Sequence, residues 1–363
     1  MFLRGQRLSD MVACVCVPTT FVLYLHLMVT QNAFEEPQLM EVDYSSASAI
    51  RPLEDTSLHS ETTAYIPEHL KSPSHIQRLL NVTVGAREEI LLVTPILRCG
   101  ATTTRNILKL LRSQNHFNLI ADPPKKAEVV HIPNLTAQRY IAGNISAFKS
   151  PSAVMQSFAY INFTQFGYQR PIQIAMVRDP IARAVSWFYH ARAPFQIIER
   201  HNRFPDTKFP TRKFLKKDIE TCLKDRKDIE CRYLPGKARY GHTVEFFCGH
   251  EENCIIFGDY EGMQRAKKVV ETEFAVVGIL EDWDKTLAVL EHYIPRFFKG
   301  VTQVYKDKLQ DNKQLTNMNF YKPKVDPKAI DYLRKNFTVE AEFYDFLRQR
   351  LDQQYKAIKL DTI

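Results

Sequence analysis

The chain has 363 residues, 45% of them hydrophobic, and a formal net charge of +8 from 49 Lys and Arg against 41 Asp and Glu. This composition excludes a wholly disordered chain and allows one large domain or two ordinary ones. A basic surface favours anionic partners, namely nucleic acid, anionic lipid or acidic polysaccharide. The sequence contains no nucleic-acid-binding module and no Cys/His spacing typical of zinc, so neither a nucleic acid nor a metal is expected.

The first element in chain order is a mostly apolar stretch at residues 11–30, which is about long enough to span a bilayer as a helix. Arg4 and Arg7 precede it, and no Lys or Arg follows until Arg51. The positive-inside rule then leaves residues 1–10 in the cytosol and the bulk of the chain in a lumen. A cleaved signal peptide is the alternative, but no small-residue cleavage site stands out, so we expect a signal anchor.

Sequons and cysteines agree with a lumenal address. Asn followed two residues later by Ser or Thr marks candidate glycosylation sites at Asn81, Asn134, Asn144, Asn162 and Asn336. Four cysteines form two tight pairs along the chain, Cys222 with Cys231 and Cys248 with Cys254, while Cys99 stands alone. In an oxidising lumen the pairs predict two local disulfides. A metal site is the alternative, although neither pair has CxxC spacing.

Residues 31–88 are polar, with scattered Pro and Ser, and are expected to form a stem between the membrane and a lumenal domain at 89–363. Within that domain, apolar runs predict buried strands, and amphipathic runs predict helices between them. The predicted strands are 90–93, 129–132, 172–177 and 275–280, and an aromatic-rich helix is expected over 332–355. This alternation is typical of an α/β fold with a mainly parallel sheet covered on both faces. Trp187 and Trp283 are expected in the core.

The turn after the first strand is the sharpest local feature, with the sequence Arg98-Cys99-Gly100-Ala101-Thr102-Thr103-Thr104 before an amphipathic helix. A Gly turn at a helix N-terminus presents backbone N–H groups and the positive end of the helix dipole to an anion. The Thr hydroxyls add donors and Arg98 adds charge. We interpret the turn as a phosphate-binding loop, although it is not a Walker A sequence. An ordinary strand-to-helix turn with Thr capping is the alternative.

A second motif, IAMVRDPIARAVSWFY, places Arg178 at the end of a strand and Ser186 about two turns into the next helix. Strand ends that open a site lie side by side in a parallel sheet, so Arg178 and Ser186 are expected to bind a second phosphate group near the first. Asp179 fits the N-cap of the helix and Pro180 its first position. We therefore expect Asp179 to cap the helix rather than to take part in catalysis.

Together these motifs resemble the sulfotransferases that use 3′-phosphoadenosine 5′-phosphosulfate as donor. The closer resemblance is to the uronyl 2-O-sulfotransferases, which include heparan sulfate and dermatan/chondroitin sulfate enzymes and insect Pipe. It runs from about residue 90 to 355, and its most specific pieces are INFTQFG, MVRDPIARAVSWFY, FFCGHEENC, FAVVGILED, IPRFFKGVTQVYKD and EAEFYDF.

The resemblance implies a nucleotide-kinase-like fold with a central parallel sheet flanked by helices. It implies that the first loop, Arg98 to Thr103, binds the 5′-phosphosulfate, and that Arg178 and Ser186 bind the 3′-phosphate. It also implies the disulfides Cys222–Cys231 and Cys248–Cys254, a homotrimer, and a single-pass type II protein of the Golgi membrane with a lumenal catalytic domain. No metal is required, because Arg and backbone donors supply the charge stabilisation.

The chain departs from this family pattern at the residues that carry the chemistry. Arg98 stands in place of the usual catalytic Lys, Ala101 in place of Ser, and Pro95 at the position of a substrate-binding Arg in the heparan enzyme. An arginine keeps the charge, but its fork has another shape and it does not give up its proton.

The larger departure precedes INFTQFG, where the family places the His that acts as general base. This chain has Met155, Ser157 and Ala159 there, and a missing base costs on the order of a hundred- to ten-thousand-fold in rate. The base is therefore unknown from the sequence. His131 and His190 are the nearest histidines along the chain, and both are expected to be core or surface residues.

Two weaker signals concern the substrates. Arg192 lies about two turns after Ser186 and faces either the anionic glycan or solvent. Lys306, Lys308 and Lys313 lie in a polar segment that closes over the nucleotide in the family, with a plain exposed loop as the alternative.

Two functions remain open. The first is transfer of a sulfuryl group from 3′-phosphoadenosine 5′-phosphosulfate to a uronic acid hydroxyl (2-O) of a glycosaminoglycan or related acidic glycan. The second is a catalytically impaired paralogue that binds donor nucleotide or glycan, or pairs with an active relative, without turnover. The missing His and the Arg98 exchange favour the second, whereas Gly100, the Thr run, Arg178 and Ser186 favour at least donor binding.

Overall fold

The structure is a computed structural model, and it describes residues 80–121, 130–225, 228, 230–231, 233–310 and 322–360. The predicted cytosolic tail and span, all of the predicted stem up to residue 79, and Lys313 lie outside these residues. In the part that is described, no helix is both long enough and apolar enough to cross a membrane.

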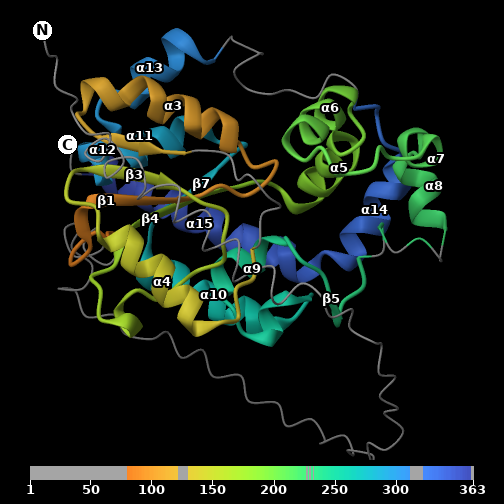
Figure 1. The fold of residues 1–363 in the computed structure, drawn as a ribbon, viewed down its shortest axis with the longest axis horizontal. Coiled ribbons are helices and arrows are strands. Elements are labelled where there is room, and N and C mark those ends of the chain that lie inside the picture. The colour runs from red at the N-terminus through yellow and green to blue at the C-terminus, as the bar shows by residue number, and fades with distance from the viewer. Residues whose placement is uncertain are drawn as a thin grey trace, which may run out of the picture. The chain divides into compact units, whose positions relative to one another are not determined.

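A five-stranded sheet with the order β2-β3-β1-β4-β7 lies at the centre of the described chain (Figure 1). Every neighbouring pair of strands in it is parallel. The strands are β1 (Arg87–Thr94), β2 (Asn118–Ile120), β3 (Ser152–Met155), β4 (Pro171–Val177) and β7 (Phe274–Ile279). All residues of β3, β4 and β7 are buried, as expected for parallel strands that are covered on both faces.

Helices cover the two faces of this sheet (Figure 1). One layer contains α3 (Ala101–Gln114), α11 (Trp283–Tyr293), α12 (Pro295–Phe298) and α13 (Val301–Lys308). The other contains α4 (Leu135–Ser146), α9 (Thr243–Cys248) and α10 (Tyr260–Glu273). The long helix α15 (Thr338–Leu360) packs against β7, α10 and α11 at one edge of the sheet. The predicted α/β fold with a central parallel sheet is confirmed.

A second, smaller apolar cluster lies beside the sheet domain. Its helices are α5 (Pro180–His190), α8 (Ile219–Lys224) and α14 (Pro327–Asn336). The helices α6 (Pro194–Arg203) and α7 (Arg212–Lys216), which contain no buried residue, lie between α5 and α8 in the chain. Ile181, Phe188 and Leu333 are buried at its centre with the Cys222–Cys231 disulfide. The short strands β5 (Lys237–Ala238) and β6 (Ile256–Phe257) pair antiparallel nearby. Two short 3-10 helices, η2 (Thr164–Phe166) and η3 (Glu252–Ile255), complete the described elements.

Both predicted disulfides are present, and Cys99 is a free, buried cysteine. Cys222 and Cys231 lie 5.8 Å apart between their Cα atoms, and Cys248 and Cys254 lie 5.5 Å apart. The second bridge ties the end of α9 to η3. The pairing by sequence proximity is therefore confirmed.

Three local expectations differ from the structure. The described part of the predicted strand at 129–132 forms no strand, because it pairs with a loop beyond β3 rather than with a sheet strand. The predicted C-terminal helix is two helices, α14 and α15, separated at Phe337. Trp187 is 43% exposed, not part of the core, because it lies on the outer face of α5. Trp283 is partly buried and stacks on Tyr305, with ring centroids 5.4 Å apart.

Candidate active site

The loop after β1 forms the N-terminus of α3. Thr104 N–H donates to the Gly100 carbonyl at 2.9 Å, which closes the first helical turn. The N–H groups of the three preceding residues have no partner within the helix, as in any first turn. Gly100 supplies no side-chain cap, and the first turn contains no acidic residue. This helix N-terminus therefore keeps its positive end open to an anion.

Glycine is required at the turn for two reasons. Gly100 has φ +81°, a left-handed conformation that L side chains rarely adopt. A Cβ at this position would lie 2.9 Å from Leu280 Cδ1 and 3.2 Å from Trp283 Cζ2. The loop backbone therefore packs directly on the residues that follow β7. Arg98 also has a positive φ, 66°, and this unusual backbone sets the direction of its side chain.

The two sequence motifs meet through Arg98. Its Nε donates to Ser186 Oγ at 3.0 Å, and Arg178 Nη1 donates to the Arg98 carbonyl at 3.5 Å. Asp179 caps α5 by accepting a hydrogen bond from Ala182 N–H at 2.7 Å, with Pro180 as the first helical residue, as predicted. Strand β4 thus delivers Arg178, and α5 delivers Ser186, to the loop that follows β1.

Three cations converge at this point. Burial and the charge of Arg178 lower the pKa of Arg98, and partial burial and the charges of Arg178 and Arg98 lower the pKa of Lys322. Glu281 is the carboxylate opposite them, 3.8 Å from Arg178 Nε and 41% exposed. Repulsion among cations indicates positive charge that nearby acids do not neutralise, which is typical of an anion site.

Lys322 is a site residue that sequence reasoning missed. It follows the predicted polar segment by several residues, in the sequence YKPK, and its neighbours there predict only a turn. The clustered basic residues of this stretch were the available signal, but they did not say which lysine would reach Arg98. Lys306 and Lys308 instead lie in the last turn of α13.

The remaining residues of the loop differ in how far their side chains are available to bind an anion. Thr104 is buried and its Oγ1 donates to the Gly100 carbonyl at 3.1 Å, and Thr103 is also buried, whereas Ala101 and Thr102 are half-buried. Burial raises the pKa of the Cys99 thiol to about 11, so it stays neutral and is no nucleophile. The contribution of Cys99 to an anion site is therefore limited to its backbone.

His190 lies one helical turn beyond Ser186 and is 7% exposed. Its burial and the charge of Arg98 lower its pKa to about 4, so the ring is neutral at neutral pH. It packs against Phe195, with ring centroids 5.7 Å apart. The expectation of a core histidine is met, although this one lines the cation cluster.

The segment where a base was expected offers none. Met155 is buried at the end of β3, and Ala159 is fully buried. The Ser157 hydroxyl donates to the Pro95 carbonyl at 2.7 Å. This bond joins the end of β3 to the loop of β1, so Ser157 supports the site instead of acting on a proton.

Arg192 is engaged in packing, away from the Arg98 loop. It is 7% exposed, and its Nη2 donates to both carboxylate oxygens of Glu230 at 2.7 and 2.6 Å. Its other donors bond the Phe188 and Phe214 carbonyls, and its guanidinium lies over both of those rings. The suggestion that it faces a glycan finds no support in these contacts.

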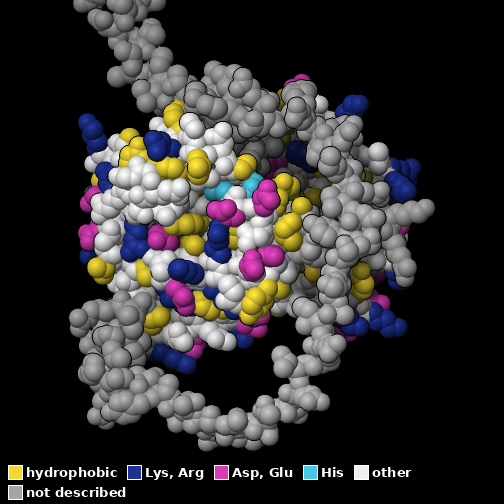
Figure 2. Space-filling view, turned by 90° about the horizontal axis from the view of Figure 1, so that it is seen from below, with side chains coloured by type: hydrophobic (Ala, Val, Ile, Leu, Met, Phe, Trp, Pro, Cys, Tyr) yellow, Lys and Arg dark blue, Asp and Glu magenta, His cyan; other side chains and the backbone are white. Residues whose placement is uncertain are grey.

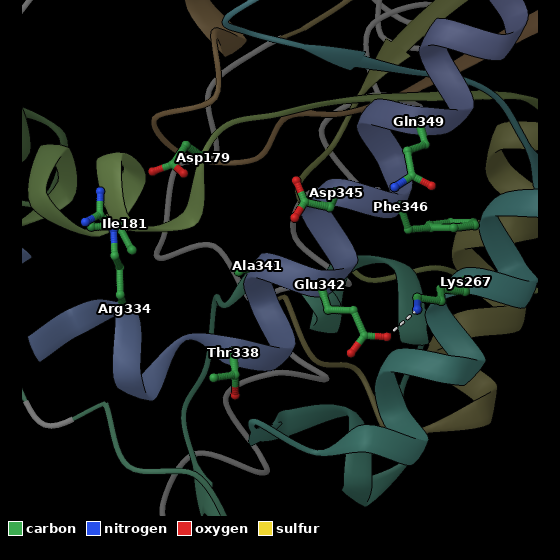
Figure 3. A pocket seen from close by; sticks show the side chains of 10 residues that line it. All are labelled: Asp179, Ile181, Lys267, Arg334, Thr338, Ala341, Glu342, Asp345, Phe346 and Gln349. Atoms are coloured by element: carbon green, nitrogen blue, oxygen red, sulfur yellow. Dashed lines mark hydrogen bonds and ion pairs between the residues drawn. The ribbon is translucent and has the colours of Figure 1, made fainter. Parts of the chain in front are cut away.

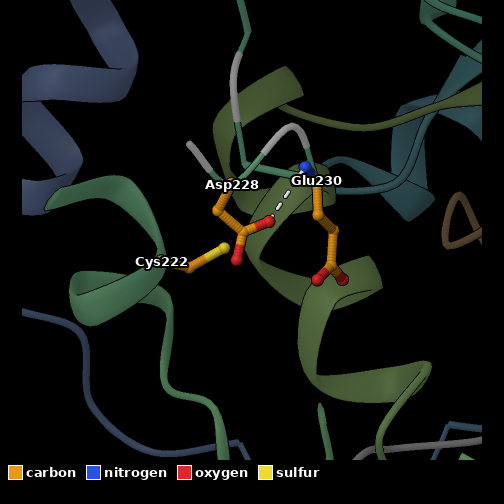
Figure 4. A group of neighbouring side chains, drawn as sticks. All are labelled: Cys222, Asp228 and Glu230. Carbon is orange, nitrogen blue, oxygen red and sulfur yellow. Dashed lines mark hydrogen bonds between the residues drawn. The ribbon is translucent and has the colours of Figure 1, made fainter. Parts of the chain in front are cut away.

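A group of possible metal ligands comprises Cys222, Asp228 and Glu230, whose ligand atoms lie within 4.8 Å of one another (Figure 4). Cys222 is already bonded to Cys231, so it offers no thiolate. Lys217 forms ion pairs with both acids, and Arg192 pairs with Glu230. The group is a salt-bridge network around a disulfide rather than a metal site.

An open hollow of about 740 Å³ lies along α15 near the start of α5 (Figure 3). Its lining includes three carboxylates and two cations, at Asp179, Glu342, Asp345, Lys267 and Arg334. Lys267 pairs with Glu342 at 2.7 Å. The excess of acids makes this hollow a poor site for an anionic ligand. On the face shown in Figure 2, basic side chains are likewise scattered among acidic ones.

Comparison with known proteins agrees with the geometry of the loop and the cation cluster. The model of the sulfotransferase family matches residues 83–347. This chain belongs to the sulfotransferase family. The match begins four residues before β1 and ends within α15, so the sulfotransferase sequence pattern includes both the sheet and the smaller cluster.

Several named relatives share this sulfotransferase pattern. Uronyl 2-sulfotransferase homolog pip of Drosophila melanogaster is 33% identical over 77% of this chain, which covers 55% of that protein's length. Uronyl 2-sulfotransferase of Homo sapiens is 27% identical over 83% of this chain and 70% of its own length. Heparan sulfate 2-O-sulfotransferase 1 of Homo sapiens is 26% identical over 73% of this chain and 72% of its own length. The suspected family is confirmed.

Proposed function

We propose that this chain transfers a sulfuryl group from 3′-phosphoadenosine 5′-phosphosulfate to a uronic acid hydroxyl (2-O) of a glycosaminoglycan or related acidic glycan. The observation that carries the proposal is the meeting of Arg98 and Arg178 beside an uncapped helix N-terminus, with the charge of Lys322 nearby and one partly exposed carboxylate opposite. The names of the relatives supply the class of acceptor.

The donor would be held at both of its anionic ends. The first-turn N–H groups of α3, the Thr102 hydroxyl and Arg98 would bind the 5′-phosphosulfate. Arg178 and Ser186 would bind the 3′-phosphate. In the structure Ser186 Oγ accepts a hydrogen bond from Arg98 Nε at 3.0 Å. When the donor enters, the Ser186 hydroxyl would give up this bond and bond to phosphate oxygens instead.

Transfer is an in-line displacement at sulfur, in which negative charge develops on the oxygen that leaves with the nucleotide. The loop N–H groups are fixed donors at that position, and Arg98, once released from Ser186, would add its charge there. Arg98 does not give up its proton, and its contribution is therefore electrostatic.

The setting of this reaction is also proposed. The apolar stretch at 11–30 would anchor the chain in the Golgi membrane as a single-pass type II protein. The domain would then lie in the lumen, where the two disulfides are stable and Asn81, Asn134, Asn144, Asn162 and Asn336 are candidate glycosylation sites. Assembly as a homotrimer would follow the family resemblance.

A second function is favoured by one observation. Met155, Ser157 and Ala159 leave the end of β3 without a base, and the Ser157 hydroxyl is bonded to Pro95. A catalytically impaired paralogue would keep the donor site and bind nucleotide or glycan without turnover.

The experiment that separates the two functions is a sulfate-transfer assay on the whole chain. It uses labelled donor with heparan, dermatan and chondroitin chains as acceptors. At donor concentrations below saturation we expect transfer that falls about 10- to 100-fold in Arg178→Ala but is retained by Arg265→Ala, a surface arginine paired only with Glu251 in the described structure. Donor binding without transfer to any of these glycans would favour the impaired paralogue.

A further inference from the structure

The chain supplies a histidine beside the segment that lacks one. Beyond β3, the Ala159 N–H donates to the Val130 carbonyl at 2.9 Å. The Ile132 N–H donates to His250 Nδ1 at 2.9 Å. Hydrogen bonds therefore hold both neighbours of His131 in place. One of these bonds is made by Ala159, two residues after Ser157, which is the position where the family resemblance places a base.

The hydrogen bond from Ile132 fixes the tautomer of His250. Nδ1 accepts this bond, so in the neutral ring the proton is on Nε2. Burial and the neighbouring His131 lower the pKa of His250 to about 4, which keeps the ring neutral. His250 Nε2 is buried. His250 is thus a rigid neutral neighbour of His131.

His131 itself is only half-buried. Its ring lies edge-on to His250, with centroids 5.7 Å apart, and 6.2 Å from the ring of Tyr240, which is 66% exposed. Burial lowers the pKa of His131 below 6.5, and within the described residues no carboxylate counteracts this. The imidazole is therefore neutral at neutral pH and able to take a proton.

Two other buried groups are less suited to this task. His190 lies beside Arg98 and Ser186, on the donor side of the site, and is 7% exposed. Glu245 is fully buried in α9, where one of its oxygens accepts from the Gly241 N–H. Both are more buried than His131, whose ring is half-buried with only Nδ1 shielded from solvent.

We propose that His131 is the general base of this enzyme and that His250 positions it. The inference rests on the proposed sulfuryl transfer. The acceptor hydroxyl oxygen forms a bond to sulfur while its proton moves to Nε2 of His131, because Nδ1 is buried and out of reach of a ligand. The bond between sulfur and the 5′-phosphate oxygen breaks, and its electron pair stays with 3′-phosphoadenosine 5′-phosphate. His131 then returns the proton to solvent.

The test compares His131→Gln with His292→Gln, an exposed histidine in the last turn of α11. We expect His131→Gln to lower kcat about 10²- to 10⁴-fold, with unchanged affinity for 3′-phosphoadenosine 5′-phosphate, and His292→Gln to change neither. Retained nucleotide binding shows that His131→Gln is folded. If His131→Gln does not fold, the same measurements are made on His131→Asn.

Two readouts separate a base from a structural residue. The wild-type kcat/KM falls as pH drops through the range in which His131 gains its proton, which burial places below that of an ordinary histidine, and this fall is absent in His131→Gln. The double variant His131→Gln, Ser157→His has a kcat at least tenfold higher than that of His131→Gln alone. His131→Gln within threefold of wild type, or an unchanged acid limb, overturns the proposal. A wild type that transfers no sulfate overturns the proposed function and this inference with it.

Discussion

Two arginines at opposite ends of α5 show how different environments give the same side chain different uses. Arg192, just beyond the helix, is bonded to both oxygens of Glu230 and to two backbone carbonyls, and lies on two aromatic rings. Arg178, just before the helix, has one carboxylate at 3.8 Å and one carbonyl at 3.5 Å. The satisfied arginine stabilises the fold, whereas the under-paired one has capacity left for a ligand.

The largest expected effect concerns another fully satisfied buried group, the carboxylate of Glu340, which is hydrogen-bonded to His242. Glu340 accepts from His242 Nδ1 at 2.9 Å and from the N–H groups of Thr243 and Val244. Burial alone would raise the pKa of Glu340, but these hydrogen bonds outweigh it and hold the pKa at about 2, against an ordinary 4.5.

The folded-state pKa of Glu340 is depressed, so its stabilisation is complete above about pH 4.5 and is lost as pH falls towards 2. The loss is on the order of 3 kcal/mol in the free energy of unfolding. Denaturant titrations between pH 7 and 3 should show this slope in wild type and a shallower one in Glu340→Gln. Glu342→Gln on the same helix, where Glu342 pairs with Lys267 at the surface, should behave as wild type. Equal slopes in all three proteins would refute the assignment.

Arg192→Ala tests the satisfied arginine. It removes a bidentate ion pair and two stacking contacts, and the free energy of unfolding should fall by about 3 kcal/mol. Glu230 is 34% exposed and regains some water, which keeps the loss at the lower end of the range for buried pairs. Thermal and urea unfolding measure the loss. Nucleotide affinity should not change, and a variant as stable as wild type would contradict the packing role.

Arg178→Ala tests the under-paired arginine, and the expected outcome is reversed. The free energy of unfolding should change little, while binding of 3′-phosphoadenosine 5′-phosphate weakens by about 1.5–3 kcal/mol, the scale of a charged hydrogen bond. Calorimetry measures the affinity, with Arg265→Ala as the surface control. Equal affinity in wild type and Arg178→Ala would remove this residue from the site.

Lys322→Ala should give the smallest effect. Lys322 is more exposed than Arg98 and Arg178, so water screens its charge more, and the loss in nucleotide affinity should be below about 1 kcal/mol and should shrink further in added salt. Titrations at two ionic strengths provide the measurement. Lys324→Ala, two residues along in the same exposed stretch, is the matched control. A loss as large as that of Arg178→Ala would mean that Lys322 contacts phosphate directly.

The sequence could predict the parts of the fold and site that depend on local pattern. Arg178 follows a buried strand, and the Asp179-Pro180 pair starts a helix, so their places follow from neighbours in the chain. The two disulfides followed from sequence proximity in the same way.

What depends on tertiary contacts could not be predicted. Arg192 has the same helical spacing as a glycan-binding residue would have, and only the position of Glu230 decides its use. Strand β3 has four residues, too few for a period-2 pattern to stand out. The run at 129–132 has the composition of a strand, yet Val130 pairs with Ala159 in a loop. Lys322 lies near enough to Arg98 for their charges to interact although more than two hundred residues separate them in the chain, and no local spacing encodes this proximity.

The central claim is that the loop after β1 and the start of α5 form one site for the donor nucleotide. Isothermal titration of the whole chain with 3′-phosphoadenosine 5′-phosphate tests it most directly, because it needs neither an acceptor glycan nor a base. We predict saturable binding of one nucleotide per chain, weakened by Arg178→Ala and by added salt. The absence of binding, or binding that is equally strong in Arg178→Ala, would contradict it.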